Sequence, residues 1–178
     1  MARRNYPLSK VYGLLEPGPV LLLSTAHRGR RNVMAMSWHT MLEFEPPLVG
    51  CVVSNRNHSF KLLKASKECV LNIPDVSLAD KVVAVGNSSG LEIDKFAAFG
   101  LTPVPSSKVQ APRVDECFAQ LECRVADTRM VNAYNLFVLE VVKAWIDPAR
   151  KDARTIHHRG WGAFMVAGET LTLPSRMR

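Results

Sequence analysis

The sequence predicts a mainly β, α+β fold: a closed antiparallel barrel with short helices inserted between its strands. Short apolar or alternating runs follow one another with turn residues between them, which is typical of barrels built from sequential strands. The helical segments are short and do not alternate regularly with strands, and no G-x-G-x-x-G motif is present. A doubly wound parallel sheet is therefore disfavoured. The length of 178 residues suits a single domain, residues 1–178.

The first elements form a predicted hairpin. Residues 20–25 are an apolar strand, and Gly29 in the basic turn that follows can adopt a positive φ. Residues 32–38 form the partner strand, in which successive side chains point to opposite faces. We therefore expect one face to carry Asn32, Met34, Met36 and Trp38, and the other to carry Val33, Ala35 and Ser37.

A proline corner and a buried strand come next. Pro46 and Pro47 offer no N–H, so residues 44–47 interrupt the ladder before the apolar strand 48–53. A polar segment follows, residues 54–59 with the sequence Ser-Asn-Arg-Asn-His-Ser, which we call the elbow. Within it, Asn57 is a good N-cap for a short helix that runs to Ala65.

The rest of the chain continues the strand-rich pattern. Loops rich in glycine, serine and proline, residues 86–90 and 102–112, separate its elements. The expected elements are strands over 68–73, 118–127 and 134–147, helical turns over 78–85 and 94–99, and one or two strands within 160–173.

Composition narrows the class of protein. Hydrophobic residues make up 47% and charged residues 22% of the chain, which is ordinary for a soluble globular domain. The four cysteines show no C-x-x-C spacing, so we expect free thiols that pack as small apolar groups rather than a zinc site or disulfides. No signal peptide is recognisable, and every apolar run is too short to span a bilayer. The sequence thus predicts a cytoplasmic protein with no membrane partner.

The net charge of +7 raises the question of nucleic-acid binding. The basic residues are scattered, however, and cluster only in residues 28–31 and 150–159. Neither cluster is interleaved with aromatic residues, as a base-stacking surface requires. The charge therefore favours anionic small molecules as ligands, and a basic nucleic-acid-binding barrel is the weaker alternative.

The elbow has the chemistry of an anion site. A helix N-terminus presents unpaired backbone N–H groups and a partial positive charge. Ser54, Asn57 and Ser59 add hydroxyl or amide donors, and the Arg56 guanidinium can hold two phosphate oxygens at once. The alternative is a capped strand-to-helix turn with Arg56 in solvent, and the elbow alone does not decide between the two.

Several motifs occur in a fixed order along residues 19–147. They are N-V-M-A-M-S-W (32–38), F-E-P-P-L-V (44–49), N-R-N-H-S (55–59), S-G-L-E-I-D-K-F (89–96) and G-L-T-P (100–103). In this order they resemble the flavin reductase-like family with the FMN-binding split barrel, in particular its flavoredoxin-type branch. Each motif alone has low specificity, and their number and order carry the resemblance.

The resemblance implies a split barrel that forms a homodimer and holds FMN at the subunit boundary, with FAD as the alternative flavin. It implies that the strand 32–38 lines the isoalloxazine ring, that the elbow holds the phosphate, and that Lys95 with Phe96 closes over the ring. The residues that would contact the flavin are Asn32, Met34, Ala35, Met36, Ser37, Trp38, His39, Thr40, Ser54, Asn55, Arg56, Asn57, His58, Ser59, Phe60, Lys95 and Phe96.

The same resemblance implies an oxidoreductase that takes electrons from NADH or NADPH and passes them through flavin to an acceptor, such as a partner oxygenase or a ferric chelate. Because hydride passes directly from nicotinamide to flavin, no catalytic side chain is expected. The five histidines show no triad or metal-ligand spacing. His157 and His158, as neighbours in an extended segment, would point to opposite faces. Either one of them lines the nicotinamide side near Trp161 or both lie in a polar loop.

Three positions depart from the family pattern. Ala35 replaces a frequent threonine, His39 replaces a smaller or apolar residue, and residues 132–135 (Asn-Ala-Tyr-Asn) stand where shorter reductases carry Gly-Asp-His. The last change removes a histidine near the nicotinamide, which keeps open a non-catalytic flavin-binding electron carrier or sensor. A pyridoxamine-phosphate-oxidase-like enzyme shares the barrel and the cofactor, but the F-x-P-P-L-V and D-K-F motifs favour the reductase branch.

Overall fold

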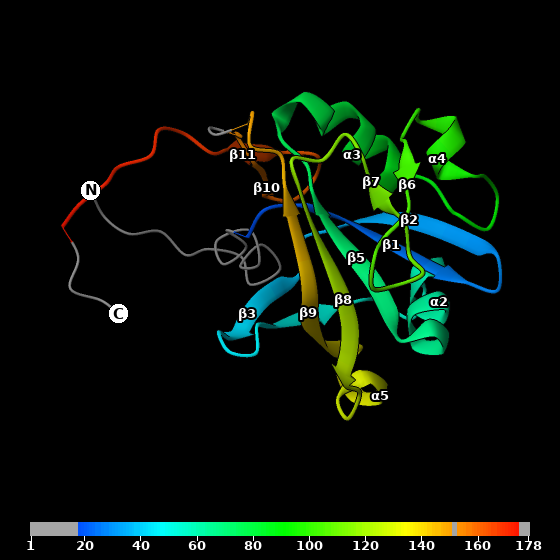
Figure 1. Cartoon of the computed structure of the whole chain (residues 1–178). Helices are drawn as coiled ribbons and strands as arrows, with labels where there is room; N and C mark the ends of the chain where they lie inside the picture. Colours follow the sequence, from blue (N-terminus) through cyan, green and yellow to red (C-terminus); the bar gives the residue numbers. More distant parts are fainter. Residues whose placement is uncertain (1–17, 151–152, 175–178) are drawn as a thin grey trace, which may run out of the picture.

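The computed structural model describes residues 18–150 and 153–174 of the chain. Seven strands form one antiparallel sheet in the order β2-β1-β5-β8-β9-β4-β3 (Figure 1). The charged start of the chain, residues 1–7, where no signal peptide is expected, lies outside the described residues. The strands of the sheet are β1 (Leu21–His27), β2 (Arg30–Met36), β3 (His39–Glu43), β4 (Leu48–Val52), β5 (Glu68–Ile73), β8 (Ala119–Asp127) and β9 (Leu136–Ile146).

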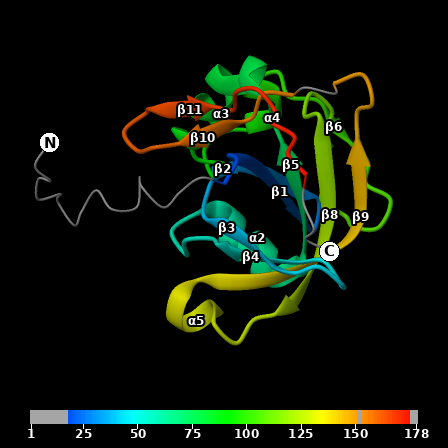
Figure 2. The same ribbon diagram turned by 90° about the vertical axis from the view of Figure 1, so that its left-hand side faces the viewer.

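Two further strand pairs lie outside this sheet. β6 (Pro103–Val104) pairs with β7 (Arg113–Val114), and β10 (Ile156–His158) pairs with β11 (Phe164–Val166). Figure 2 shows the β10–β11 hairpin and helix α5 (Val131–Tyr134) as two projections on the same side of the molecule. Both projections contribute residues to the pocket described below.

The helices are short, as predicted. α2 (His58–Ser66) follows the elbow, and α3 (Ala79–Gly86) follows the single turn η2 (Val76–Leu78). α4 (Lys95–Ala98) begins at Asp94, whose carboxylate accepts hydrogen bonds from two backbone N–H groups of the first turn. This N-cap satisfies donors that a four-residue helix cannot bond internally.

Two hydrophobic cores lie on opposite faces of the β1–β2 hairpin. Met34 and Met36 pack into the first core, which fills the space enclosed by the large sheet. Val33 and Ala35 face the second core, where α3 and α4 cover the hairpin. The predicted alternation along β2 is confirmed, because a single strand serves both cores.

The expected closure of the barrel is not present: the hydrogen-bonded ladder of the described residues has two edges, β2 and β3. The predicted strand 32–38 ends at Met36, and Ser37 and Trp38 lead the chain into β3, which the sequence did not predict. Four of the five β3 positions are exposed, so no buried alternation marks this strand. The two edges are consecutive in the chain, and they meet at this corner instead of pairing.

Two further expectations are corrected towards the end of the chain. The predicted strand 134–147 starts late, because the chain first forms α5 and then Asn135 adopts a φ of +56°. His157 and His158 lie in strand β10 and not in a polar loop. The reason is Ile156, which is 1% exposed in the second core and anchors the strand.

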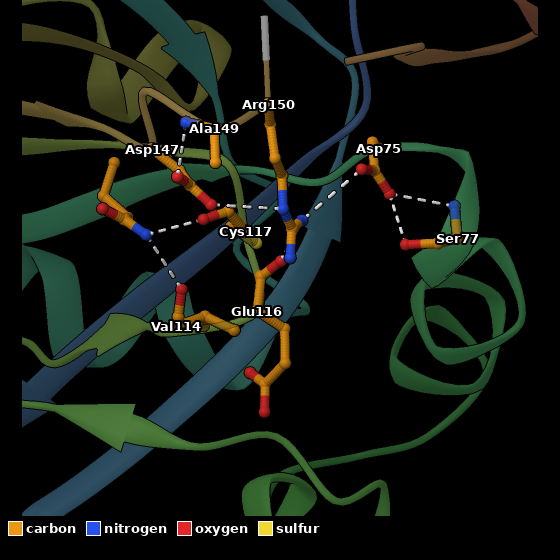
Figure 3. Close-up of polar contacts among 9 residues, drawn as sticks. Asp75, Ser77, Val114, Glu116, Cys117, Asp147, Ala149 and Arg150 are labelled. Atoms are coloured by element: carbon orange, nitrogen blue, oxygen red, sulfur yellow. Dashed lines mark hydrogen bonds and ion pairs between the residues drawn. The ribbon is translucent and has the colours of Figure 1, made fainter. Parts of the chain in front are cut away.

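Arg150 joins three turns at one end of the sheet (Figure 3). Its guanidinium donates to the Glu116 carbonyl oxygen at 2.9 Å and lies 3.4 Å from a carboxylate oxygen of both Asp75 and Asp147. Asp75 also caps η2 by accepting from the backbone N–H of Ser77. These contacts fix the start of the segment that leads to the β10–β11 hairpin.

Candidate functional site

A pocket of about 720 Å³ opens beside β2. Its walls come from β2 and the corner after it, the end of β4, the elbow, α3, the end of α5 and the β10–β11 hairpin. The lining residues are Val20, Met34, Ala35, Met36, Ser37, Trp38, Val52, Ser54, Asn57, Val82, Val83, Gly86, Asn87, Tyr134, Asn135, His158, Gly162 and Phe164. The pocket is therefore bounded by both projections seen in Figure 2.

The β2 strand and the corner after it form one long wall of the pocket. Met34, Ala35 and Met36 line this wall, followed by Ser37 and Trp38. In the described structure β2 pairs only with β1, so no second strand takes the main-chain groups of its other edge. Such an edge offers backbone N–H and C=O groups to a ligand.

The elbow contributes Ser54 and Asn57 to the pocket. Its shape comes from two hydrogen bonds to Ser54: the Asn57 N–H donates to the carbonyl oxygen at 2.9 Å, and the Arg56 N–H donates to the hydroxyl oxygen at 3.3 Å. Asn57 holds the N-cap position of α2, as predicted, but its side chain makes no capping hydrogen bond. The first turn of α2 also contains no acidic residue. The positive end of the helix is thus open to an anion.

His58 adds an unusual feature to this helix end. Its Nδ1 atom is buried and has no hydrogen-bond partner among the described residues. Burial lowers the pKa of the imidazole, and the positive charges of Arg30, Lys61 and Lys95 lower it further. A buried polar atom without a partner is costly, and a nearby anion would satisfy both the atom and the surrounding cations. The residues of the elbow therefore fit a phosphate group.

Asn32 and Ser59, both predicted to touch a ligand, bond to each other instead. The Asn32 amide donates to the Ser59 hydroxyl at 2.9 Å, and the Thr25 hydroxyl donates to the same oxygen at 3.4 Å. Asn32 is 4% exposed and Ser59 is fully buried. Gly90 packs so closely on Asn32 that a methyl group there would overlap the amide oxygen. Neither Asn32 nor Ser59 lines the pocket; together they tie β2 to α2.

Lys95 and Phe96 also lie outside the lining of the pocket. Lys95 is 5% exposed, and its ammonium donates to the Val85 carbonyl oxygen at 2.8 Å. Burial lowers the pKa of this ammonium group. Phe96 is buried in the second core, with the Arg31 guanidinium 5.1 Å from its ring centre. The pair braces the C-terminal end of α3, whose Gly86 reaches the pocket.

Six other predicted contact residues surround the site without lining it, and His58, described above, is one of them. His39 has a structural role, because its Nε2 atom lies 2.7 Å from the Pro19 carbonyl oxygen and joins β3 to the chain entering β1. Phe60 packs edge-on against Phe137 in the first core. The remaining three are exposed: Thr40, Asn55 and Arg56.

The two adjacent histidines separate as the alternation of a strand requires. His158 lines the pocket, with its ring 5.2 Å from the ring of Phe164. The Nε2 atom of His157 lies 2.9 Å from the Thr155 hydroxyl, and this residue is not part of the lining. Of these two histidines, only His158 lines the pocket.

Sequence reasoning missed the wall that α3 supplies, through Val82, Val83, Gly86 and Asn87. A signal for it exists in Ala35, which replaces a frequent threonine. A Cβ atom at Gly86 would lie 3.6 Å from the Ala35 Cβ, so two small residues let the helix approach the strand. Asn135, Gly162 and Phe164 were also missed, because they come from the end of α5 and from the β10–β11 hairpin, far away in the sequence.

The described residues offer few alternative chemistries. No group of three or more histidine, cysteine, aspartate or glutamate side chains gathers in them as a metal site. None of their helices is both long enough and apolar enough to cross a bilayer. All four cysteines are free and buried, and burial raises the pKa of the Cys51 thiol far above its usual range.

Known proteins resemble this chain in sequence. The model of the family described as Flavin reductase like domain matches residues 14–162, which is most of the chain. The chain belongs to the flavin reductase-like family. One relative of the chain, the protein YddH of Escherichia coli, is 33% identical to it over 174 residues; the match covers 89% of this chain and 92% of YddH.

Solved structures agree with the family assignment. The FMN-binding domain of a flavin reductases-like enzyme from Shewanella baltica matches with a TM-score of 0.81 and 27% identity, covering 98% of this chain and all of that one. Flavoredoxin of Desulfovibrio vulgaris matches with a TM-score of 0.84 and 23% identity, covering 97% of each chain, which supports the fold alone. The predicted mainly β, split-barrel fold class of this flavin reductase-like protein is thus confirmed.

Proposed function

We propose that this flavin reductase-like protein binds FMN in the pocket beside β2 and passes electrons from NADH or NADPH through it to an acceptor. One observation carries the proposal: the pocket joins the outer edge of β2 to a helix N-terminus, and in the described residues neither this edge nor the buried imidazole nitrogen of His58 has a hydrogen-bond partner. A flat ring with a terminal phosphate needs both features. FMN suits the compact elbow better than FAD, because it carries a single phosphate.

The elbow would hold the phosphate. Ser54 and Asn57 reach the pocket with a hydroxyl and an amide, and the open N–H groups of α2 lie behind them. His58 would donate from its buried Nδ1, and Arg56 is exposed beside them, free to fold onto the phosphate oxygens. The cations that surround His58 favour a dianionic group at this place.

The β2 edge would orient the ring. Main-chain groups on the unpaired edge of β2 can bond to the polar edge of a flat ligand, while apolar side chains of β4 and α3 exclude water from its faces. When bound, FMN supplies the two-electron redox chemistry of the site. The protein then needs no nucleophile, in keeping with its deeply buried thiols.

A second copy of the chain is part of the proposal. β3 is an edge strand beside the pocket corner, and it exposes the apolar side chains of Met41 and Leu42, followed by Phe44 at 88% exposure. A patch of this kind is typical of a protein interface, and we propose a homodimer that covers it. Four free thiols also suit a reducing compartment, so we propose that the protein is cytoplasmic. We further propose that residues 1–178 form one domain.

A non-catalytic flavin-binding carrier is the second candidate. One observation favours it: α5 and its cap bring Tyr134 and Asn135 into the pocket, where some relatives are expected to have a histidine. His158 is then the one histidine among the lining residues of the described chain. A carrier would hold flavin and exchange electrons with a protein partner, without reacting with NADH or NADPH.

The deciding experiment measures NADH and NADPH oxidation by protein that has been incubated with FMN and freed of excess flavin. Retained flavin absorbance together with turnover of either nucleotide supports the reductase. Retained flavin without turnover of either one favours the carrier. Protein that stays colourless and takes up no FMN contradicts both.

A further inference from the structure

The tip of the β10–β11 hairpin presents a tryptophan in a strained conformation. Trp161 has a φ of +54° and lies between Gly160 and Gly162, whose φ values are +92° and +76°. The Ala163 N–H donates to the Gly160 carbonyl oxygen at 3.0 Å, which closes a tight turn with Trp161 at its first central position. Glycine and asparagine are the residues that normally occupy this position.

The turn explains the positive φ but not the presence of a tryptophan at this position. A bulky side chain with positive φ is a genuine outlier, and such residues gather at ligand clamps and active sites. Trp161 is 91% exposed, the highest value among the large apolar side chains of the described residues. Its indole ring therefore gives nothing to either hydrophobic core.

The hairpin that carries Trp161 forms part of the pocket wall. His158, Gly162 and Phe164 line the pocket on both sides of the tip. Ile156 is buried in the second core, and its carbonyl oxygen accepts from the Val20 N–H at 2.8 Å, so the hairpin is anchored at its base. Figure 2 shows it projecting on the side of the molecule that carries α5.

Other exposed rings share this location. In the described part of the chain, three tryptophan or tyrosine side chains are more than half exposed: Trp38 at 56%, Tyr134 at 65% and Trp161. Trp38 and Tyr134 line the pocket, and Trp161 is adjacent to Gly162, which does so too. The elbow and the end of α5 belong to one part of the pocket wall, and the hairpin belongs to another.

We propose that Trp161 stacks on the planar, electron-poor ring of a second ligand of the flavin site, either the nicotinamide of the oxidised nucleotide NAD⁺ or NADP⁺ or the ring of an aromatic acceptor. The proposal rests on the proposed function, in which the phosphate of the flavin occupies the elbow and leaves the hairpin side to the second ring. An indole is electron-rich and pairs well with an electron-poor ring in offset stacking. One ring is far too small for a protein interface, which needs about 800 Å² on each partner.

The test uses the FMN-loaded protein and three variants. Trp161→Gly removes the ring and relieves the strain, Trp161→Phe keeps a smaller ring, and Trp145→Phe is the matched control, since Trp145 packs against Arg113 and Lys143 away from the pocket. Binding of NAD⁺, NADP⁺ and 4-nitrobenzoate is measured by calorimetry. ADP-ribose is the control ligand, because it lacks only the nicotinamide ring of NAD⁺.

We expect Trp161→Gly to weaken at least one of the ring-bearing probes about tenfold or more, as stacking on a planar base does. Trp161→Phe should weaken it less. Affinity for ADP-ribose and the amount of retained FMN should stay unchanged. The Tm should stay unchanged or rise slightly as the strain is relieved. A loss confined to NAD⁺ or NADP⁺ identifies the donor ring, and a loss confined to 4-nitrobenzoate identifies the acceptor ring.

Three results would overturn the role of Trp161. The first is unchanged affinity of Trp161→Gly for every ring-bearing probe, and the second is an equal loss of affinity for NAD⁺ and ADP-ribose. The third is a lower molecular mass of Trp161→Gly than of the wild-type protein by light scattering, which would place the ring in a contact between two copies. Failure of the wild-type protein to retain FMN is a different result, because it contradicts the proposed function itself.

Discussion

The amide of Asn32 donates a hydrogen bond to the buried hydroxyl of Ser59 at 2.9 Å. This bond joins β2, which lines the pocket, to the first turn of α2, which ends the elbow. Two side chains expected to touch the flavin thus bond to each other and hold β2 and the elbow in one geometry.

Replacing Asn32 tests the tie directly. Asn32→Ala should lower the free energy of unfolding by about 1–3 kcal/mol, because the buried Ser59 hydroxyl loses a partner. FMN binding should also weaken, since the elbow is no longer held to β2. Asn72→Ala is the matched control: Asn72 is fully buried and donates to the Leu22 carbonyl oxygen at 2.7 Å, outside the pocket. Equal losses of FMN affinity in the two variants would argue against a specific tie.

Gly90→Ala should disturb the same tie from the other side. The added methyl group would overlap the Asn32 amide oxygen, so the amide must leave its position or the loop must shift. We expect a loss of about 1–3 kcal/mol in unfolding free energy, the usual range for overpacking. Gly168→Ala is the control, because a Cβ atom there meets nothing within 4 Å. If both glycine variants unfold at the same denaturant concentration, the close packing on Asn32 is not real.

Asn57→Ala should separate ligand binding from stability. Because the Asn57 side chain makes no capping hydrogen bond, its removal should cost less than the ~1 kcal/mol typical of an N-cap residue. FMN should bind more weakly, whereas riboflavin, which lacks the phosphate, should bind as before. Thermal unfolding and flavin titration check the two effects. A large loss of Tm with unchanged FMN affinity would show that Asn57 is only a cap.

His58 makes the stability of the flavin-free protein depend on pH. Its folded-state pKa is lowered from the usual 6.5, so the unfolded chain takes up the proton first as pH falls. The contribution of His58 to stability is therefore complete above pH 6.5 and declines below it. His58→Gln should reduce the loss of Tm between about pH 7.5 and 5.5. A wild-type slope that the variant leaves unchanged would assign the effect to another group.

Local sequence patterns predicted much of the fold. The alternation along β2, the N-cap position of Asn57 and the helical turn after Asp94 are local features, so each could be read from neighbouring residues. β3 was missed because its exposed residues lack the alternation that a buried strand shows. Its pairing with β4 is a long-range property of the sheet.

The site was predicted less completely, for physical reasons. Lysine is almost never buried, so nothing local indicated that Lys95 would bond to the Val85 carbonyl oxygen inside the protein. The contact between Asn32 and Ser59 joins residues 27 positions apart and leaves no periodic signal. The walls from α3 and the β10–β11 hairpin likewise depend on tertiary packing, which one sequence does not encode as a pattern.

The central claim is that the elbow holds the phosphate of a flavin, and calorimetric titration of the wild-type protein with FMN and with riboflavin tests it most directly. Charge-assisted hydrogen bonds contribute about 1.5–3 kcal/mol each, so FMN should bind at least about tenfold more tightly than riboflavin. Arg56→Ala should reduce the ratio of FMN affinity to riboflavin affinity, because the exposed guanidinium would bond to the phosphate, which riboflavin lacks. Equal affinities of the wild-type protein for FMN and riboflavin would contradict the account.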